Sequence, residues 1–535
     1  MTYCAICHNF YTTKCNDIIV SLYSCTFRLE FDGQELLLFN LDNHNLFYYD
    51  FLFNYLHLML EGHNPLAAYM RASQRSQRSQ SLTHGVSIAI LRRAWNSFAR
   101  LLDLDFENSF LCPVCGTTPN TVVCDGTMLG FRKDLITACS PFDLQEAVSD
   151  KPLLKGSKHS DRVLIKKPKA RELLLKFSGI SCDRKRLQNP KPLSQRDFTC
   201  LQNDLVKDGL KSLANLLRRL RSETPNNLCP ESYRAFLSEL ARNSPVCGLV
   251  QLGGNQDIYK LLHQLASTEL NIQDSTCHSQ LHLLQAHTPV LAEFICKCPK
   301  EDGRLPSDVR ALFADILLQI DATFSGDTNP ATHYLPIQPS PWSFFPALPL
   351  VRGAGNYDAD KKSPPSDADS CRKASYGHPH LTPGIFTIYC PHGVCYGFEV
   401  MRKCESPQHP FKIFTTRFSQ PPRAIIYDNA CKLHNYALNR EPLLYKSTRF
   451  FIDRFHWRGH IGCSRGYCLD SYKTSNFSQI NSQVNEQANS GLQRIKGQLA
   501  YMRPENFIFT LSIFLAMNNM DKIKRLDVSG LSVEE

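Results

Sequence analysis

Apolar residues recur at helical spacing in well-separated parts of the chain. Residues 83–106 place an apolar stripe opposite several arginines, and residues 480–502 place another opposite polar positions that include Glu486. A period of about 3.6 residues brings such positions onto one face of a helix. We therefore expect core-facing amphipathic helices in both segments, and another packed helix in the apolar run 507–517.

Short β-type runs bounded by turn residues form a second pattern. The run 121–124 is followed by Asp-Gly, and the run 423–427 is followed by Asp-Asn. Residues 384–389 and 395–401 flank a tight Pro-His-Gly turn. Runs of this length and composition predict strands, and the closely spaced pair predicts a β-hairpin. We expect the run 423–427 to be a strand that leads into a helix.

A long interval separates the first of these strands from the hairpin. Its first part is rich in lysine and arginine, and helical periodicity then returns at 201–222, 231–242 and 257–295. We interpret residues 136–352 as a mainly helical insertion. Residues 353–383 have the composition of a loop with few apolar anchors, which predicts a long flexible surface segment.

Composition and charge favour a protein with a polyanionic partner and reduced thiols, and disfavour a membrane-spanning protein. The 535 residues carry 60 Lys and Arg against 50 Asp and Glu, so the formal charge is +10, which suits a polyanionic partner such as nucleic acid. The most apolar stretches, 45–60 and 507–517, do not have the length and apolar character of a membrane span. Without a secretory signal pattern, the 22 cysteines indicate reduced thiols, and some of them are expected to bind zinc together with histidines.

Carboxylates follow two of the predicted strands. Asp125 and Asp428 each stand at the end of an apolar run, and Glu486 lies on the polar side of a predicted helix. Strand ends of an α/β sheet meet at one edge, so these three oxygen ligands would suit two Mg²⁺ or Mn²⁺ ions. Spacing alone leaves another interpretation open, in which the aspartates are turn residues and the glutamate is solvated.

Five segments, in this order along the chain, resemble a known family. They are CPVCGTTPNTVVCDGTMLGFRKD (112–134), GIFTIYCPHGVCYGFEVM (384–401), YDNACKLHNYALNREP (427–442), FIDRFHWRGHIGCSRGY (451–467) and INSQVNEQANSGLQRIKGQLAYM (480–502). Together they resemble the Kyakuja-Dileera-Zisupton (KDZ) superfamily of eukaryotic DNA transposases. The resemblance covers most of residues 84–520 and is strongest from 384 to 502.

The resemblance implies a fold and an activity. It implies an α/β, RNase H-like catalytic core interrupted by a large, mainly helical insertion, to which the Cys/His spacings discussed below add small zinc-site elements. It also implies a DDE-type triad of Asp125, Asp428 and Glu486 that cleaves and joins DNA strands with two Mg²⁺ or Mn²⁺ ions. The expected partner is DNA, at transposon ends or in the host genome, and the expected location is the nucleus. A homo-oligomer is a further possibility.

These expectations divide the chain into consecutive segments. They are a degenerate Cys/His-containing N-terminal region (1–70), a helix with a CxxC motif and the first catalytic strand (71–135), the helical insertion (136–352), the loop (353–383), the remainder of the core (384–520) and a C-terminal tail (521–535). Within them, residues 71–80 have the polar, basic composition of a solvated linker. In the first region, Cys4, Cys7, His8, Cys15 and Cys25 resemble the remnant of the cysteine-cluster module that relatives carry there.

Two further sets of residues have the spacing of zinc ligands. The pair Cys112-x-x-Cys115 needs two more ligands, for which Cys390, His392 and Cys395 at the hairpin turn are available. The second set is Cys431, His456, His460 and Cys463. The alternatives are packed thiols in the first set and ordinary polar histidines in the second.

Trp457, Arg458 and Arg465 lie between the second and third acids. An aromatic ring can stack on a base and arginine can bind phosphate, so we expect these residues to border a DNA groove, although core packing is an alternative for Trp457. The competing function is a catalytically inactive, domesticated transposase-derived protein that binds zinc and DNA. A zinc-dependent hydrolase is disfavoured because no HExxH motif is present.

Overall fold

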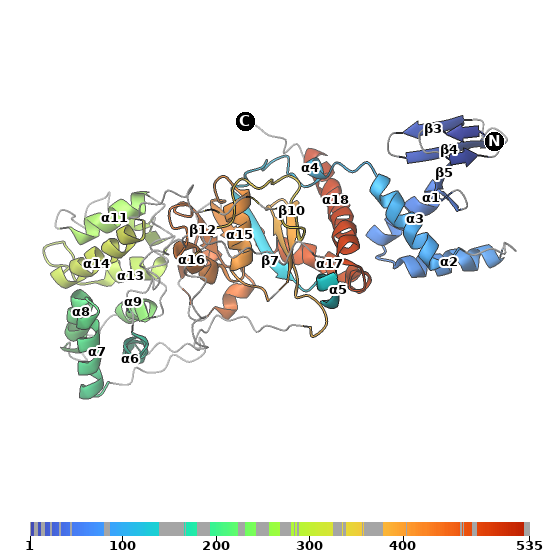
Figure 1. Cartoon of the computed structure of the whole chain (residues 1–535). Helices are drawn as coiled ribbons and strands as arrows, with labels where there is room; N and C mark the ends of the chain where they lie inside the picture. The colour runs from blue at the N-terminus through green and yellow to red at the C-terminus, as the bar shows by residue number, and fades with distance from the viewer. Residues whose placement is uncertain are drawn as a thin grey trace.

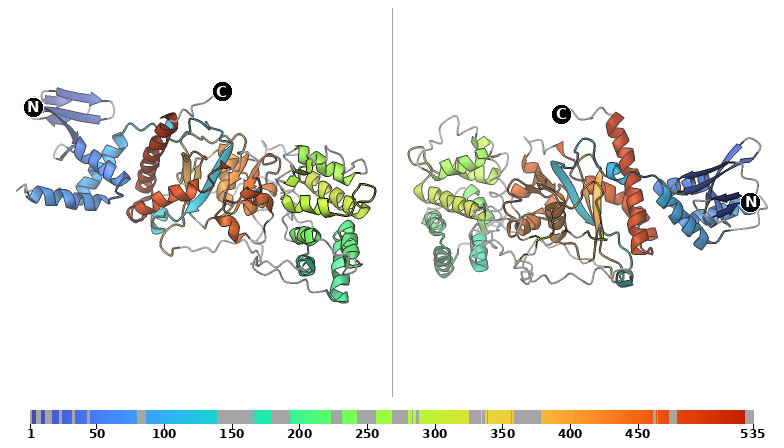
Figure 2. Two further views of the ribbon diagram at one scale, coloured as in Figure 1. Left: turned by 180° about the vertical axis from the view of Figure 1, so that it is seen from behind. Right: turned by 45° about the horizontal axis from the view of Figure 1, so that its top comes forward.

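The computed structural model has a central mixed sheet with a separate group of elements on either side (Figure 1). The two further views in Figure 2 show the same succession of N-terminal elements, central sheet and helical region. The structure describes residues 2–4, 9–11, 17–21, 24–31, 34–42, 45–79, 86–138, 165, 167–178, 193–222, 231–241, 256–267, 280–282, 284–285, 288–324, 334, 337, 339–355, 357, 378–402, 404–460, 463, 465–472 and 479–528. Most of the predicted loop 353–383 lies outside these residues, as do Cys7, His8 and Cys15.

The central sheet has six strands in the order β12-β11-β7-β9-β10-β8. Strands β7, β11 and β12 are parallel, whereas β9 is antiparallel to both β7 and β10, and β8 is antiparallel to β10. The strands are β7 (Thr121–Thr127), β8 (Ser343–Phe344), β9 (Gly384–Tyr389), β10 (Cys395–Met401), β11 (Ala424–Ile426) and β12 (Arg449–Phe451). The predicted hairpin and both predicted strands are confirmed, although β7 continues through Asp125 to Thr127.

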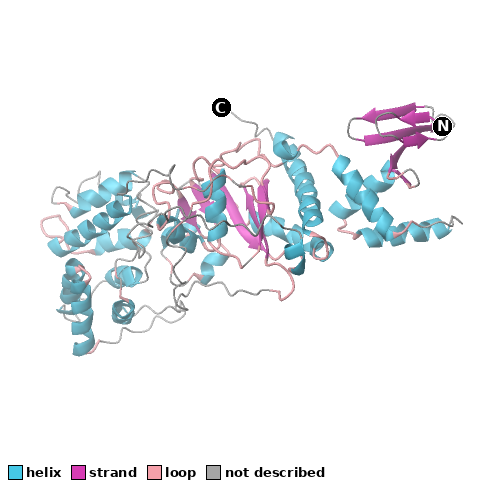
Figure 3. Cartoon of the chain, in the orientation of Figure 1, coloured by secondary structure: helices cyan, strands magenta, loops and turns pink. Residues whose placement is uncertain are grey.

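Helices cover both faces of this sheet, as Figure 3 shows. Because successive side chains of a strand point to opposite faces, Phe386 and Ile388 of β9 pack with α15 and α16, whereas Ile385 and Tyr389 pack with α17 and α18. The helices are α15 (Gln408–Arg417), α16 (Ala430–Leu438), α17 (Val484–Leu499) and α18 (Pro504–Val528). Burial on both sides explains why every residue of β9 is buried.

Two of these helices correspond to sequence patterns. α17 confirms the helix predicted in 480–502, with Leu492 and Ile495 on its buried stripe. α18 includes the apolar run 507–517 and continues through residue 528, so the start of the predicted C-terminal tail is helical instead. Partly buried Ile523 and Leu526 pack against the core, which accounts for the longer helix.

The interval between β7 and β9 contains a helical region with its own core. Its apolar cluster is built almost entirely from residues of this interval, and Leu438 of α16 joins it. The helices include α6 (Pro168–Ser178), α7 (Gln195–Lys207), α8 (Lys211–Ser222), α9 (Glu231–Ala241), α11 (Gln256–Ala266), α13 (Pro289–Lys297) and α14 (Ser307–Phe324). The region therefore packs largely on itself beside the sheet.

The N-terminal elements are an antiparallel sheet followed by helices. The antiparallel strands β3 (Asp17–Ser21), β4 (Ser24–Phe31), β5 (Gln34–Asn40) and β6 (Leu46–Tyr48) are followed by the helices α1 (Tyr49–Leu60), α2 (Leu66–Ser79) and α3 (Ile88–Leu101). α2 includes most of the stretch predicted to be a linker; its Ala, Arg and Gln residues favour a helix, and Tyr69 donates a hydrogen bond to the Phe51 carbonyl.

α3 confirms the amphipathic helix predicted in 83–106. The Ser87 hydroxyl accepts a hydrogen bond from the Ile90 backbone amide and so caps its first turn. Trp95 and Phe98 are buried in a cluster with the aromatic residues of α1. Among the described residues, no helix is both long and apolar enough to cross a membrane.

Candidate functional site

The ends of two parallel strands bring two aspartates together. Asp125 lies in β7 and Asp428 follows β11, and the register pairs Ile426 with Val123, so both acids stand two residues beyond the same pair. Both are buried, with exposed fractions of 8% and 7%. Carboxylate oxygens of Asp125, Asp428 and Glu405 all lie within 4.8 Å of one another. This set is called the acid group below.

Glu405 enters the acid group from the connection between β10 and α15. Its Oε1 accepts a hydrogen bond of 2.9 Å from the hydroxyl of Tyr427, the residue before Asp428. A methyl group on Gly126 would lie 2.6 Å from its Oε2 atom, so the glycine leaves room for this carboxylate. No sequence pattern predicts Glu405 as a site residue, because a single acid in a polar turn carries no periodic or motif signal.

Glu486 takes a different position from the one predicted. It lies in the first turn of α17, is 47% exposed, and among the described residues it does not join the acid group. Its Oε1 lies 3.9 Å from Nε2 of His456, whose Nδ1 is 2.7 Å from Oδ2 of Asp453. The hydrogen bond to buried Asp453 raises the pKa of His456. Glu486 is therefore the neighbour of an Asp–His pair.

The residue before Glu486 fixes the start of α17 on the sheet. The buried side chain of Asn485 donates to the backbone carbonyls of Val123 in β7 and Thr387 in β9, at 3.4 and 3.3 Å. The hydroxyl of Thr387 donates a hydrogen bond to Oδ1 of Asn485 at 3.1 Å. These contacts hold the first turn of α17, and with it Glu486, against the two central strands.

Negative charge is concentrated around the acid group. The pKa of Cys124, which lies between Val123 and Asp125, is raised well above its usual value by burial and then by the charges of Asp125, Asp428 and Glu405. Three neighbouring carboxylates with hard oxygen donors are the ligand set that Mg²⁺ or Mn²⁺ prefers. The acid group is thus suited to a divalent cation.

A second group contains sulfur ligands. Ligand atoms of Cys112, Cys115, Cys390 and His392 lie within 4.8 Å of one another, although the first pair and the hairpin turn are far apart in the chain. Nδ1 of His392 is 3.6 Å from Sγ of Cys112 and 3.2 Å from Sγ of Cys115. These thiols raise the pKa of His392 to about 10. We call these four residues the Cys₃His group.

Cys395 does not belong to the Cys₃His group. It begins β10, and its side chain packs in the apolar cluster with Tyr389 on the α17 side of the sheet, whereas Cys390 packs on the other side. Its thiol instead donates to the Gly397 carbonyl at 3.5 Å. The two cysteines of the turn therefore point to opposite faces, and only Cys390 reaches the CxxC pair.

The other predicted zinc set is divided by the structure. Cys431, His460 and Cys463 have ligand atoms within 4.8 Å of one another, and His456 is not among them because it faces Asp453 and Glu486. His456 begins the short 3₁₀ helix η3 (His456–Gly459), and His460 follows its end, so His456 and His460 do not share one face of an α-helix.

The residues proposed to contact DNA have different surroundings. Trp457 is half-buried against the core, and its ring is stacked on His460 with an interplanar angle of 6°. Arg458 is exposed. Arg465 begins the 3₁₀ helix η4 (Arg465–Tyr467), and its side chain lies outside the described residues. Core packing thus explains the position of the Trp457 side chain, whereas the exposed side chain of Arg458 can bind a phosphate.

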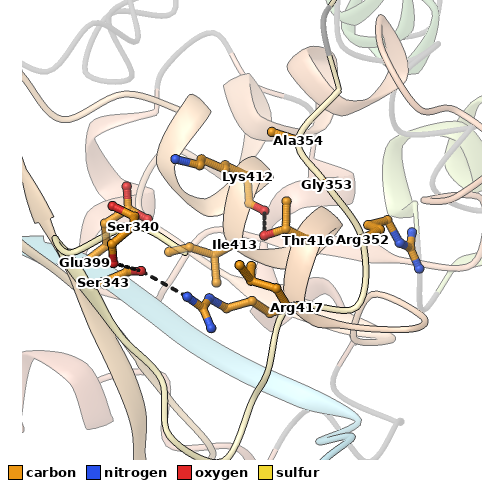
Figure 4. Close-up of a pocket in the computed structure, with 11 residues that line it drawn as sticks. Ser340, Ser343, Arg352, Gly353, Ala354, Glu399, Lys412, Ile413, Thr416 and Arg417 are labelled. Carbon is orange, nitrogen blue, oxygen red and sulfur yellow. Dashed lines mark hydrogen bonds between the residues drawn. The ribbon is translucent and has the colours of Figure 1, made fainter. Parts of the chain in front are cut away.

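A small cavity of about 40 Å³ beside α15 contains none of these residues (Figure 4). Arg417 lines it, donating to the Ser343 hydroxyl at 3.0 Å and to the Leu348 carbonyl at 2.7 Å, and Lys412 lies nearby. Burial lowers the pKa of Arg417 to about 10. Its hydrogen bonds join α15 to the edge of the sheet, which is a structural role.

Comparison of the chain with family models, with curated proteins and with solved structures found no match.

Proposed function

We propose that the chain is a KDZ-type DDE DNA transposase, which cleaves DNA strands and transfers them with divalent metal ions. The observation that carries this proposal is the meeting of buried Asp125 and Asp428 at the ends of neighbouring parallel strands. Burying two carboxylates side by side is costly unless a cation or proton compensates them. This cost favours a functional site over a pair of turn residues.

The proposed fold is an RNase H-like core with a helical insertion. It is supported by the mixed sheet, in which three parallel strands adjoin an antiparallel hairpin, and by helices on both faces. The helical region between β7 and β9 has the place expected of the insertion. This arrangement leaves the acid group at the carboxyl end of the parallel strands, where open α/β sheets bind ligands.

The proposed cofactors are two Mg²⁺ or Mn²⁺ ions. Asp125, Asp428 and Glu405 would hold them, with Glu486 as the further ligand expected from the family resemblance. When bound, such ions lower the pKa of an attacking water and stabilise charge on the leaving oxygen. The chain itself contributes a buried, oriented pair of aspartates, and the Tyr427 hydroxyl fixes the Glu405 carboxylate.

The proposed partner is DNA, and the proposed location is the nucleus. The net charge of +10 favours a polyanion, and Arg458 offers an exposed cation two residues after His456, the neighbour of Glu486. The Cys₃His group has the four donors of a structural zinc site, which would join the CxxC segment to the hairpin turn. A homo-oligomer is proposed on the family resemblance alone.

A second function is favoured by the position of Glu486. The exposed third acid lies beside His456 and outside the acid group, as expected if the chain is a catalytically inactive, domesticated protein that binds zinc and DNA. For an active enzyme, the exposed side chain of Glu486 must turn toward the ions when metal and DNA bind, while Asn485 keeps the first turn of α17 on the sheet. The two functions therefore differ in whether DNA is cut.

The deciding experiment is cleavage of a labelled DNA duplex by the full-length protein with Mg²⁺, Mn²⁺ or EDTA. Asp428→Asn should abolish metal-dependent nicking and leave the fold intact, and exposed Glu107→Gln is the matched control that should retain it. Nicking by Asp428→Asn at the wild-type rate would remove the assignment. A folded wild-type protein that binds DNA and does not cut it would support the inactive function.

A further inference from the structure

Three metal-ligand side chains lie together outside both the acid group and the Cys₃His group. They are Cys431 in the first turn of α16, and His460 and Cys463 after η3. Nδ1 of His460 is 3.7 Å from Sγ of Cys431 and 3.4 Å from Sγ of Cys463. The ring of Trp457 lies nearly parallel to that of His460, with the two centroids 6.5 Å apart.

One ring nitrogen facing two sulfur atoms points to a shared cation. A neutral imidazole nitrogen carries either one proton or one lone pair, so Nδ1 can make a full hydrogen bond to only one of the two thiols. A tetrahedral zinc ion, with Zn–S near 2.3 Å and Zn–N near 2.0 Å, places its sulfur and nitrogen ligands about 3.5 Å apart. Both distances at His460 are close to that value, as are both at His392.

The three ligands leave one coordination position to be filled. Within the part of the chain that the structure describes, no fourth Cys, His, Asp or Glu joins them. His456, four residues before His460, has its ring between Asp453 and Glu486. His434, three residues after Cys431, is buried, and its Nδ1 lies 2.8 Å from the Tyr467 hydroxyl. Cys431 and Cys463 are only half-buried, so solvent reaches this group. Three protein ligands and one solvent position are typical of an open zinc site.

We propose that Cys431, His460 and Cys463 bind one Zn²⁺ with three protein ligands and one exchangeable position. This ion would join the helix that follows Asp428 to the segment that carries His456, the neighbour of Glu486. It would therefore fix the segment that carries His456 relative to the helix that follows Asp428. The binding site itself does not depend on whether the protein cleaves DNA.

The first test is the zinc content of the full-length protein after dialysis against Mg²⁺-containing buffer. Folded Cys431→Ser and Cys463→Ser proteins should each contain one zinc fewer per chain than wild type. His456→Gln, the matched control, should contain as much zinc as wild type. Wild-type zinc content in both serine variants would overturn the proposal, and loss of one zinc in His456→Gln would overturn the ligand set.

The second test detects the open coordination position in the wild-type protein and then uses variants to assign it. Full-length protein loaded with Co²⁺ should change its visible absorption on addition of azide, because azide replaces the solvent ligand at the open site. Cys115→Ser, which removes a ligand of the Cys₃His group, should keep the whole azide response, whereas Cys431→Ser should lose it. A wild-type spectrum that saturating azide leaves unchanged would contradict the exchangeable position.

Discussion

Nε2 of His456 lies 3.9 Å from Oε1 of Glu486, and the opposite ring nitrogen is 2.7 Å from Asp453. The hydrogen bond to Asp453 raises the pKa of His456 above 6.5 in the folded protein. Protonated His456 therefore stabilises the fold fully below its unfolded pKa, and this contribution is lost as pH rises through the folded pKa. The pair makes stability depend on pH near neutrality.

The first prediction is the pH dependence of His456→Gln in metal-free protein. Its loss of stability relative to wild type should be largest near about pH 5.5 and smallest near about pH 9, with a maximum of about 1 kcal/mol because the side chain is partly exposed. Urea denaturation at several pH values measures this difference. A loss of the same size at every pH would show that His456 contributes only through packing.

The second prediction concerns the space beside Gly126. In Gly126→Ala the new methyl group would meet the Glu405 carboxylate, which is the end of a flexible side chain and can turn away. The fold should survive, while affinity for Mn²⁺ should fall about 10- to 100-fold, as for other changes that misplace a ligand. Isothermal titration with Mn²⁺ measures the change.

Glu405→Gln tests the same carboxylate directly. It should weaken Mn²⁺ binding at least as much as Gly126→Ala does. The double variant should bind Mn²⁺ about as weakly as Glu405→Gln alone, because both changes remove the same ligand. Exposed Glu107→Gln is the control. If the two single effects add in full, Gly126 acts on the site by a route other than Glu405.

Sequence patterns identified the elements that carry the acids and the sulfur ligands. α3, α17 and the β9–β10 hairpin follow from periodicity and turn residues, because each pattern is local and unambiguous. The pairing of Asp125 with Asp428 followed from two strand ends and the family resemblance. The Cys₃His group was predicted as a set with one extra member, because a turn sequence does not reveal on which face Cys390 and Cys395 emerge.

Other features depend on contacts that no local pattern encodes. Glu405 joins the acid group through a contact between distant parts of the sequence, in which the Tyr427 hydroxyl donates a hydrogen bond to its carboxylate. His456 does not belong to the second sulfur group because Asp453 binds it twice. Oδ1 of Asp453 accepts a hydrogen bond from the His456 backbone amide, and Oδ2 is bonded to the ring nitrogen Nδ1, so the other ring nitrogen faces Glu486. The polar run 71–80 was predicted to be a linker because it has few apolar positions. The anchor of α2 lies just before that run, where Tyr69 donates a hydrogen bond to the Phe51 carbonyl in α1.

The third prediction concerns zinc in the Cys₃His group. Cys115→Ser removes one of its four donors, so the protein should lose one zinc per chain and its free energy of unfolding should fall by about 3 kcal/mol or more at zinc concentrations far above Kd. Exposed Cys404→Ser is the matched control and should change neither quantity. Zinc analysis with thermal denaturation measures both. Equal zinc content in the two variants would contradict a metal role for Cys115.

The fourth prediction is that Asn485 sets both stability and the position of Glu486. Asn485→Leu keeps a similar volume but removes the hydrogen bonds to Val123 and Thr387, leaving their buried polar groups without that amide, so unfolding should cost about 1–3 kcal/mol less. If Glu486 must approach the acid group for cleavage, the same variant should also lose most of its nicking rate, because the first turn of α17 is no longer fixed on the sheet. Exposed Ser490→Ala on the same helix should change neither stability nor nicking. Reduced stability with a full nicking rate would separate the two roles and show that Glu486 does not depend on this anchor.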